Sequence, residues 1–212
     1  MSVVPDDTRP ASRGQRLPRR ERRVQLLDAA REVFVASGYH AAAMDDIAEA
    51  AGVSKPVLYQ HFPGKLELYL ALLDASSDAL VAAVEAALAS TADNKLRVQA
   101  TTQAYFDFVD DPGGTFRLIF ESDLTNEGAV RERVDRTNDA CATLTSKVIA
   151  EDTGLTEAQA MLLAAGLIGA AQTAARHWLR DGSAIPKDEA VRLVSTLTWR
   201  GISGIPLSHP PA

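Results

Sequence analysis

The sequence predicts an all-α protein, with a small N-terminal domain of three helices followed by a larger helical domain. Two observations carry this prediction. Apolar residues recur at spacings of three and four along most of the 212 residues, which is the period of an α-helix with one buried face. The segments between these runs are short and contain glycine, proline or a capping residue. We find no strand pattern, hairpin turn or internal repeat.

Two segments make up the predicted N-terminal part. Residues 1–17 are rich in proline, glycine, serine and arginine without periodicity, which predicts a flexible basic arm. Residues 18–64 are predicted to form a three-helix domain, with helices after Pro18, over 44–51 and over 55–62. Gly38 is a suitable left-handed stop for the first helix. The apolar face expected on that helix consists of Val24, Leu27, Ala30, Phe34 and Val35.

Residues 65–212 are predicted to form the larger helical domain, which would bind a ligand and dimerise. Asp93 is placed to cap one of its helices, and Gly154 to end another. The helices are expected at about 65–90, 94–110, 115–122, 126–151, 156–182 and 186–203.

Composition narrows the class of protein. A hydrophobic fraction of 46% with 24% charged residues is typical of a folded globular chain. No charge-free apolar stretch of about 18 residues is evident, and the N-terminus lacks a signal sequence, so we expect a cytoplasmic protein. The single cysteine, Cys141, excludes an intramolecular disulfide. We expect no metal, no cofactor and no membrane partner.

The charge is divided unevenly along the chain. Between Arg9 and Arg31 there are eight arginines against two acidic residues, a local net charge of +6, although the whole chain carries −6. From Leu66 onward the net charge is −8. A basic head on an acidic body is expected where one end meets nucleic acid phosphates. A solvated basic tail without a partner is the alternative.

Residues 44–62, MDDIAEAAGVSKPVLYQHF, are typical of a helix-turn-helix. Gly52 permits the sharp turn and Leu58 anchors the second helix in the core. Ser54 is placed to cap that second helix. Donors and apolar groups suited to a major groove are then left exposed on it. An ordinary helical corner would explain the spacing equally well.

Residues 38–73 closely resemble the DNA-binding domain of the TetR family, through the elements G-Y, D-I-A, A-G-V-S, L-Y-x-H-F and G-K-L-E-L. The resemblance implies that Tyr59, His61 and Lys65 contact phosphates. Lys65 would do so near a helix N-terminus, a natural anion site. The expected DNA-binding residues are Arg16, Arg19, Ser54, Lys55, Pro56, Val57, Tyr59, Gln60, His61 and Lys65.

The chain departs from the family pattern at one point. The family often has threonine or serine just before the second helix, as a cap and phosphate contact, whereas this chain has Ala42 and Ala43. We therefore expect Asp45 and Asp46 to stabilise the start of that helix instead.

The last two helices are expected to pair with those of a second copy. Small residues recur from Ala160 to Ala175, which allows close approach of helix axes. The resemblance implies a four-helix bundle between protomers, and two half-sites read by a twofold pair. Closure of the monomer core is the alternative. The expected interface residues are Leu163, Trp178, Leu193, Leu197 and Trp199.

An aromatic cluster predicts where an effector binds. Most of the aromatic residues of the larger domain lie between Tyr105 and Phe120, and on adjacent helices they could line a tunnel for a small apolar molecule. Plain core packing is the alternative for each ring, and Cys141 is equally explained as a small apolar residue. The expected ligand-binding residues are Phe106, Phe116, Phe120, Leu124, Cys141, Met161 and Leu167.

The segments RGQRLPRRERRVQLLDAA, FRLIFESD and WRGISGIPL are similar to those of actinobacterial regulators of fatty-acid synthesis within the TetR family. This likeness implies a long-chain acyl-CoA effector and a lipid-synthesis promoter. We find no enzyme motif. The competing interpretation is a carrier of acyl chains that keeps the helix-turn-helix only as structure. The sign of regulation stays open.

Overall fold

The computed structural model describes residues 17–111, 113–114, 124, 127–180 and 184–201, and every regular element among them is a helix. The all-α prediction is therefore confirmed. The predicted short helix over 115–122 lies outside the described residues. The helices are α1 (Arg19–Ala41), α2 (Met44–Ala50), α3 (Lys55–His61), α4 (Lys65–Ala89), α5 (Asn94–Val109), α7 (Gly128–Thr153), α8 (Glu157–Arg180) and α9 (Lys187–Arg200).

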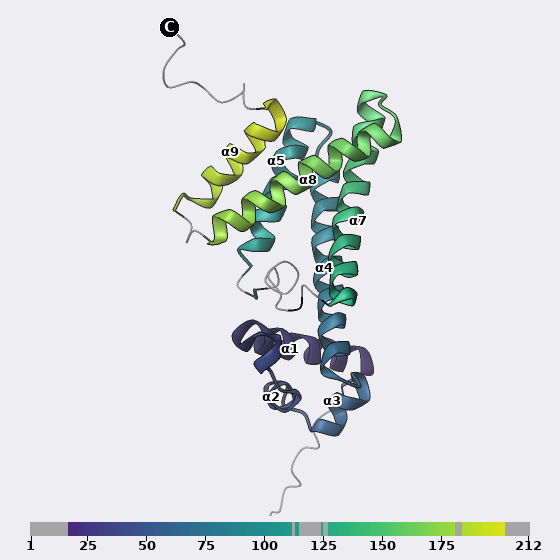
Figure 1. Cartoon of the computed structure of the whole chain (residues 1–212), viewed down its shortest axis with the longest axis vertical. Coiled ribbons are helices and arrows are strands. Elements are labelled where there is room, and N and C mark those ends of the chain that lie inside the picture. Colours follow the sequence, from purple (N-terminus) through teal and green to yellow (C-terminus); the bar gives the residue numbers. More distant parts are fainter. Residues whose placement is uncertain (1–16, 112, 115–123, 125–126, 181–183, 202–212) are drawn as a thin grey trace, which may run out of the picture.

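Two groups of helices lie at opposite ends of an elongated molecule (Figure 1). Helices α1, α2 and α3 form one end, and α5, α8 and α9 gather at the other. The 25-residue helix α4 runs from the first group to the second with α7 beside it, and Nε of Arg133 on α7 donates to Asp74 on α4 at 2.8 Å. At about 1.5 Å per residue, α4 spans roughly 37 Å.

Helix α1 buries a face that differs by part of a turn from the predicted one. Its buried residues are Leu26, Ala29, Ala30 and Phe34, while Val24 is 54% exposed. The prediction for Val24 was wrong because the spacing of apolar residues does not tell which of them face the neighbouring helices. Gly38 does have a positive φ of 73°, although a further turn follows it to Ala41.

The corner between α2 and α3 has the predicted geometry. Gly52 adopts φ +61°, a conformation that other residues adopt only with strain, and the amide of Val53 donates to the carbonyl of Ala48 at 2.9 Å. Ile47 on α2 and Leu58 on α3 are both 0% exposed. The two short helices are therefore held rigidly together by a shared core.

The two predicted helix caps had different outcomes. The backbone carbonyl of Ser54 accepts from the amides of Val57 and Leu58, but its side chain makes no capping bond, so that prediction was wrong. At the start of α2, Asp46 accepts from the amide of Ala43 at 3.2 Å. Asp46 therefore supports the start of the helix by accepting from this amide, but no side chain takes the place of the missing threonine or serine in capping the first amides of α2.

Caps in the larger domain follow the sequence closely. Asp93 accepts from the amides of Lys95 and Leu96 at 2.8 and 3.1 Å and so begins α5. Gly154, with φ +69°, ends α7. Local residue types fix these boundaries because the bonds that make them span only two or three residues.

The loop after α5 contacts the three-helix end of the molecule. Gly114 has φ +64°, and a Cβ placed on it would lie 2.6 Å from Cγ1 of Val35 on α1. Only glycine allows this close approach. The larger domain therefore contacts α1 through this loop, in addition to the continuous helix α4.

The expectation that no segment is long and apolar enough to cross a membrane was wrong for helix α8. By length and composition it could cross a membrane, with a mean hydropathy of 1.3 over its most apolar window, of which only 28% is buried within the protomer. A core helix of a soluble protein meets the same test.

Candidate nucleic-acid interface and effector cavity

Helix α3 presents one face to solvent and buries the other. Leu58 faces the core at 0% exposure, whereas Tyr59 is 47% exposed. Ser54, Lys55, Pro56 and Gln60 are exposed as well, and Val57 and His61 are half-buried. The predicted contact residues of this helix thus share an accessible surface, as a helix that enters a DNA groove requires.

Arginines of α1 lie around the C-terminal end of α3. Desolvation lowers the pKa of His61 below its usual value, and the charges of Arg19, Arg23 and Arg22 lower it further. The guanidinium of Arg23 also lies over the ring of Phe62, 4.3 Å from its centroid. Several positive charges therefore gather beside the exposed face of α3, where phosphates would be attracted.

Arg22 and Arg23 were not among the DNA-binding residues expected from the sequence. Arg22 bonds to Gln25 at 2.7 Å, and Gln25 in turn donates to the carbonyl of Ala51, so this part of α1 is fixed against the turn after α2. The run of arginines is visible in the sequence. Which of these arginines face α3 depends on how α1 packs, and the sequence alone does not tell this. Arg16 lies outside the described residues.

Lys55 forms an ion pair with Asp45 of α2, and both side chains are more than half exposed. An exposed pair of this kind contributes little to stability. The ammonium can therefore exchange Asp45 for a phosphate at small cost, and its role in DNA binding stays a prediction.

Lys65 is engaged within the protein. Its ammonium donates to the carbonyls of Tyr39, His40 and Ala42 at 2.8, 3.2 and 2.8 Å and lies 4.5 Å from the centroid of the Tyr39 ring. An ammonium has three donors, and all three are used here. A phosphate contact would require Lys65 to release one of these carbonyls, so its first role is to tie the end of α1 to the start of α4.

We therefore expect Lys65→Met to lower the free energy of unfolding by about 1–3 kcal/mol, because three carbonyls at the end of α1 lose a charged donor. Lys55→Met is the matched control, since its exposed pair contributes less than about 1 kcal/mol. Urea unfolding followed by circular dichroism measures both. Equal stabilities of the two variants would contradict this role.

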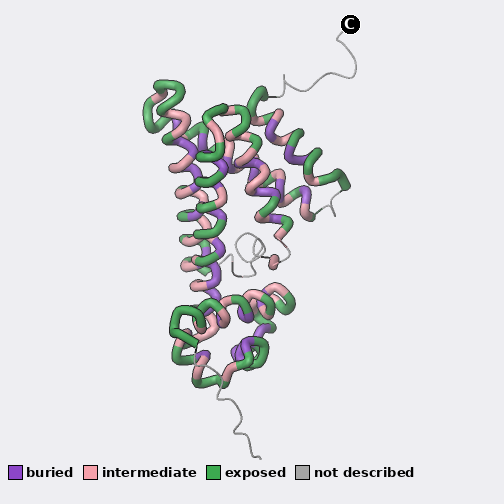
Figure 2. The backbone as a smooth tube through the Cα atoms, turned by 180° about the vertical axis from the view of Figure 1, so that it is seen from behind, coloured by how far each residue is buried: buried purple, intermediate pink, exposed green. Residues whose placement is uncertain are grey.

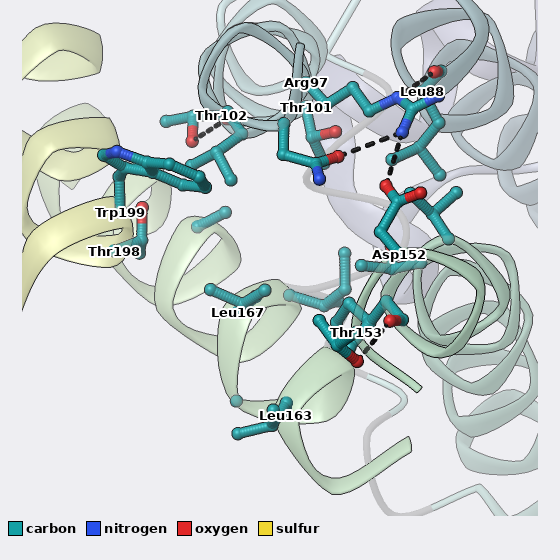
Figure 3. Close-up of a pocket in the computed structure, with 18 of the residues that line it drawn as sticks. Leu88, Arg97, Thr101, Thr102, Asp152, Thr153, Leu163, Leu167, Thr198 and Trp199 are labelled. Atoms are coloured by element: carbon teal, nitrogen blue, oxygen red, sulfur yellow. Dashed lines mark hydrogen bonds and ion pairs between the residues drawn. The ribbon is translucent and has the colours of Figure 1, made fainter. Parts of the chain in front are cut away.

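A cavity of about 580 Å³ lies at the far end of the molecule, among α4, α5, α7, α8 and α9 (Figure 3). Its walls are mostly apolar, with Leu88 from α4, Leu163 and Leu167 from α8, and Trp199 from α9. This size and lining are typical of a site for a small apolar ligand. Leu88 lies one residue before the end of α4, whose first residue is Lys65.

One side of the cavity is polar. Arg97 donates through Nε to the carbonyls of Leu88 and Thr91, and through Nη1 to Asn94 and Asp152. This bonding holds the C-terminal ends of α4 and α7 against α5 and fixes the frame of the cavity. No sequence pattern predicts this bonding, because Arg97 and Asp152 are 55 residues apart.

Of the predicted ligand residues, Leu167 lines the cavity and four others do not. Phe106 and Cys141 are 0% exposed, and the Phe106 ring packs 5.5 Å from that of Trp178. Leu124 and Met161 are half-buried elsewhere. These four residues do not border this cavity, because apolar character predicts burial but not which buried residues line a cavity. Phe116 and Phe120 lie outside the described residues.

The cysteine is a packing residue. Burial raises the pKa of the Cys141 thiol, which disfavours the thiolate that redox chemistry needs. Burial likewise raises the pKa of the neighbouring Tyr105 hydroxyl. Within the described part of the chain, no group of three or more histidine, cysteine, aspartate or glutamate residues is arranged to hold a metal ion.

The predicted dimer residues divide into two sets. Leu163, Leu197 and Trp199 are 50%, 42% and 44% exposed, and Leu193 is half-buried, so they remain available to a partner. Figure 2 shows exposed residues along the outer sides of the helices at this end. Trp178 is 8% exposed, and its indole N–H donates to the carbonyl of Ile185 at 2.9 Å. The prediction for Trp178 is corrected, since it already packs in the protomer core.

An exposed second helix of a helix-turn-helix, flanked by arginines and carried on a larger helical domain, is typical of a regulator of transcription. Two family descriptions match the chain: "Bacterial regulatory proteins, tetR family" over residues 26–72 and "Tetracyclin repressor-like, C-terminal domain" over residues 95–201. The chain belongs to the TetR family of bacterial transcription regulators.

Individual relatives agree with this assignment. The chain is 48% identical over 206 residues to the HTH-type transcriptional activator FasR of Mycolicibacterium smegmatis, covering 96% of this chain and 94% of that protein. A TetR-like regulator from Rhodococcus sp. RHA1 has a similar structure, with a TM-score of 0.71, 29% identity and coverage of 90% and 100%. FadR of Bacillus subtilis, solved in complex with stearoyl-CoA, shares the fold with a TM-score of 0.70 at 18% identity over 84% and 98%.

Proposed function

We propose that this regulator binds a palindromic operator as a homodimer through α3, and that a long-chain acyl-CoA bound in the cavity changes its DNA affinity. The observation that carries the proposal is the position of the two sites. The exposed face of α3 and the apolar cavity lie at opposite ends of the molecule, and α4 runs from one to the other. The target would be a lipid-synthesis promoter.

Two likenesses support the choice of effector and of target. FadR of B. subtilis, solved in complex with stearoyl-CoA, shares the fold, and FasR, which is 48% identical over 96% of this chain, is named a transcriptional activator. The acyl chain would occupy the apolar walls of the cavity. Following FasR, we propose that this chain activates transcription and works in the cytoplasm.

Two connections could carry the signal to α3. The first is α4, which begins at the Lys65 bonds to α1 and reaches the cavity at Leu88. The second is α5, which lines the cavity and leads to Gly114 against Val35 of α1. A ligand that tilts either helix would change the separation of the two α3 helices in a dimer. Its effect is limited by its differential affinity for the two arrangements.

Titration of palmitoyl-CoA against operator DNA tests the effector. We expect the dissociation constant of the protein–DNA complex to change by about 5- to 150-fold at saturation, the usual range of coupling between two sites. Free coenzyme A is the control, since it lacks the acyl chain. An unchanged dissociation constant at saturating palmitoyl-CoA would exclude this class of effector.

His61 gives the proposal a pH dependence. Because its pKa lies below the usual 6.5 in the free protein, His61 is neutral at pH 7.5. A phosphate beside it would raise the pKa, so the complex would take up protons and operator affinity would rise as the pH falls through the pKa of His61 in the complex. We expect His61→Gln to remove this rise, with affinities measured at pH 7.5 and 5.5 in constant salt.

The exposed residue His40 supplies the control for that measurement. A His40→Gln variant should keep the full rise in affinity at low pH. If His61→Gln keeps it as well, His61 does not contact a phosphate.

A further inference from the structure

A second pocket, of about 270 Å³, lies beside the effector cavity where α5 packs against α9. Trp199 of α9 lines both the cavity (Figure 3) and this pocket, so the two spaces are neighbours that share one side chain. The other residues that line the pocket are Lys95, Gln99, Arg192, Ser195, Thr196 and Arg200.

The pocket is basic, although the domain that carries it is acidic. From Leu66 onward the chain has 12 lysines and arginines against 20 aspartates and glutamates. Three of these cations, Lys95, Arg192 and Arg200, border this pocket, and no carboxylate is among the described residues that line it. Cations gathered around a hollow without any acidic residue are suited to an anionic ligand.

Two of these cations are available to a ligand. Lys95 and Arg192 are both exposed, on α5 and α9 respectively. Within the described part of the chain, the ammonium of Lys95 forms no hydrogen bond or ion pair. Arg192 pairs with Glu189 at 3.7 Å, with side chains that are 65% and 49% exposed, and such a pair contributes little to stability. Phosphate oxygens can therefore take the place of Glu189 at small cost.

The effector cavity itself offers no such cation. Arg97 is the one basic residue among the described residues that line it, and its guanidinium already donates to four acceptors of the protein. The charged part of an effector would therefore find unengaged cations in the neighbouring pocket and not in the cavity.

We propose that the phosphates of an acyl-CoA bind in the pocket formed by Lys95, Arg192 and Arg200, while its acyl chain lies in the cavity on the other side of Trp199. This inference rests on the proposed function and adds to it the position of the charged part of the effector. Lysine and arginine bind phosphate through charge-assisted hydrogen bonds. An apolar molecule with the same chain but no phosphate uses the cavity alone and binds more weakly.

The double substitution Lys95→Gln/Arg192→Gln removes two of the three charges from exposed positions, so the fold should persist. Arg136→Gln/Lys147→Gln is the matched control, because both residues are exposed on α7 and line neither the cavity nor the pocket. Calorimetry measures the affinity of each protein for palmitoyl-CoA and for S-palmitoyl-N-acetylcysteamine. The second ligand has the same acyl chain and thioester but no phosphate.

We expect the wild type to bind palmitoyl-CoA at least about tenfold more tightly than the phosphate-free thioester, because a hydrogen bond to a charged group contributes about tenfold or more. Lys95→Gln/Arg192→Gln should lose this advantage and keep the wild-type affinity for the phosphate-free thioester. Equal affinities of the wild type for the two ligands would overturn the proposal. So would a double variant that binds palmitoyl-CoA as tightly as the wild type, or one that binds both ligands equally less tightly.

Operator binding gives a second measurement. The pocket lies at the end of the molecule away from α3, so Lys95→Gln/Arg192→Gln should bind the operator with the wild-type affinity when no effector is present. With palmitoyl-CoA it should reach the same final affinity as the wild type, but the half-maximal effect should need at least about tenfold more ligand. An unchanged half-maximal concentration would contradict the proposal.

The two proposals fail in different ways. If the wild type binds neither ligand, the proposed effector is wrong and this inference falls with it. If the wild type binds palmitoyl-CoA and Lys95→Gln/Arg192→Gln binds it equally well, acyl-CoA remains the effector and only the position of its phosphates is wrong. If Arg136→Gln/Lys147→Gln weakens binding as much, the net charge of the domain explains the effect, and the inference is overturned.

Discussion

Replacement of both Tyr59 and Gln60 by alanine is expected to weaken operator binding by about 100-fold or more. Tyr59 is 47% exposed and Gln60 lies exposed beside it on α3, so both can reach a groove. A good contact to a base is worth about 1–3 kcal/mol, and a twofold dimer loses each contact twice. Fluorescence anisotropy with labelled operator at constant salt measures the change.

The controls separate loss of contact from loss of fold. Both side chains are exposed, so the double variant should unfold at nearly the wild-type temperature and bind palmitoyl-CoA normally. Leu96→Ala, which removes a 49% exposed side chain from α5, should leave operator affinity unchanged. If the double variant binds the operator as tightly as the wild type, α3 is not the recognition helix. A carrier of acyl chains, the competing interpretation, would already lack sequence-specific binding in the wild type.

Leu58→Ala is expected to lower the free energy of unfolding by about 2–5 kcal/mol. Leu58 is 0% exposed and belongs to the same buried cluster as Ile47 and Phe62, so its removal leaves a cavity in the small core that fixes α3 against α2. Such a loss is large compared with the usual total stability of a domain. DNA binding should therefore disappear through unfolding of the helix-turn-helix.

The neighbouring residue supplies the comparison for this variant. Tyr59→Ala alone, one position away but exposed, should change the free energy of unfolding by less than about 0.5 kcal/mol. Thermal unfolding by calorimetry measures both variants. The packing account of this corner is wrong if Leu58→Ala unfolds at the same temperature as Tyr59→Ala.

The three-helix end was largely predictable from sequence because its determinants are local. The turn at Gly52, the buried Leu58 and the bond from the Ala43 amide to Asp46 all act over a few residues. One local prediction, the side-chain cap from Ser54, was wrong, and the other differences concern contacts from farther away. Lys65 bonds carbonyls 23 to 26 positions before it, and no spacing rule predicts that.

The cavity was much less predictable. Its walls come from five helices, and residue type alone does not separate a wall from the core: Leu167 lines it, whereas Phe106 packs against Trp178. The bond between Arg97 and Asp152 depends on how α5 meets α7. Such tertiary arrangements follow from packing, which a single sequence does not display.

The most direct test of the account is selection of bound fragments from random DNA by the purified protein, followed by a measurement of how many protomers bind each duplex. We predict an inverted repeat bound by a pair of protomers, with half-site centres about one helical turn, roughly 34–36 Å, or a multiple of it apart. Recovery of no preferred sequence at low salt, or of an asymmetric site bound by a single protomer, would contradict the account.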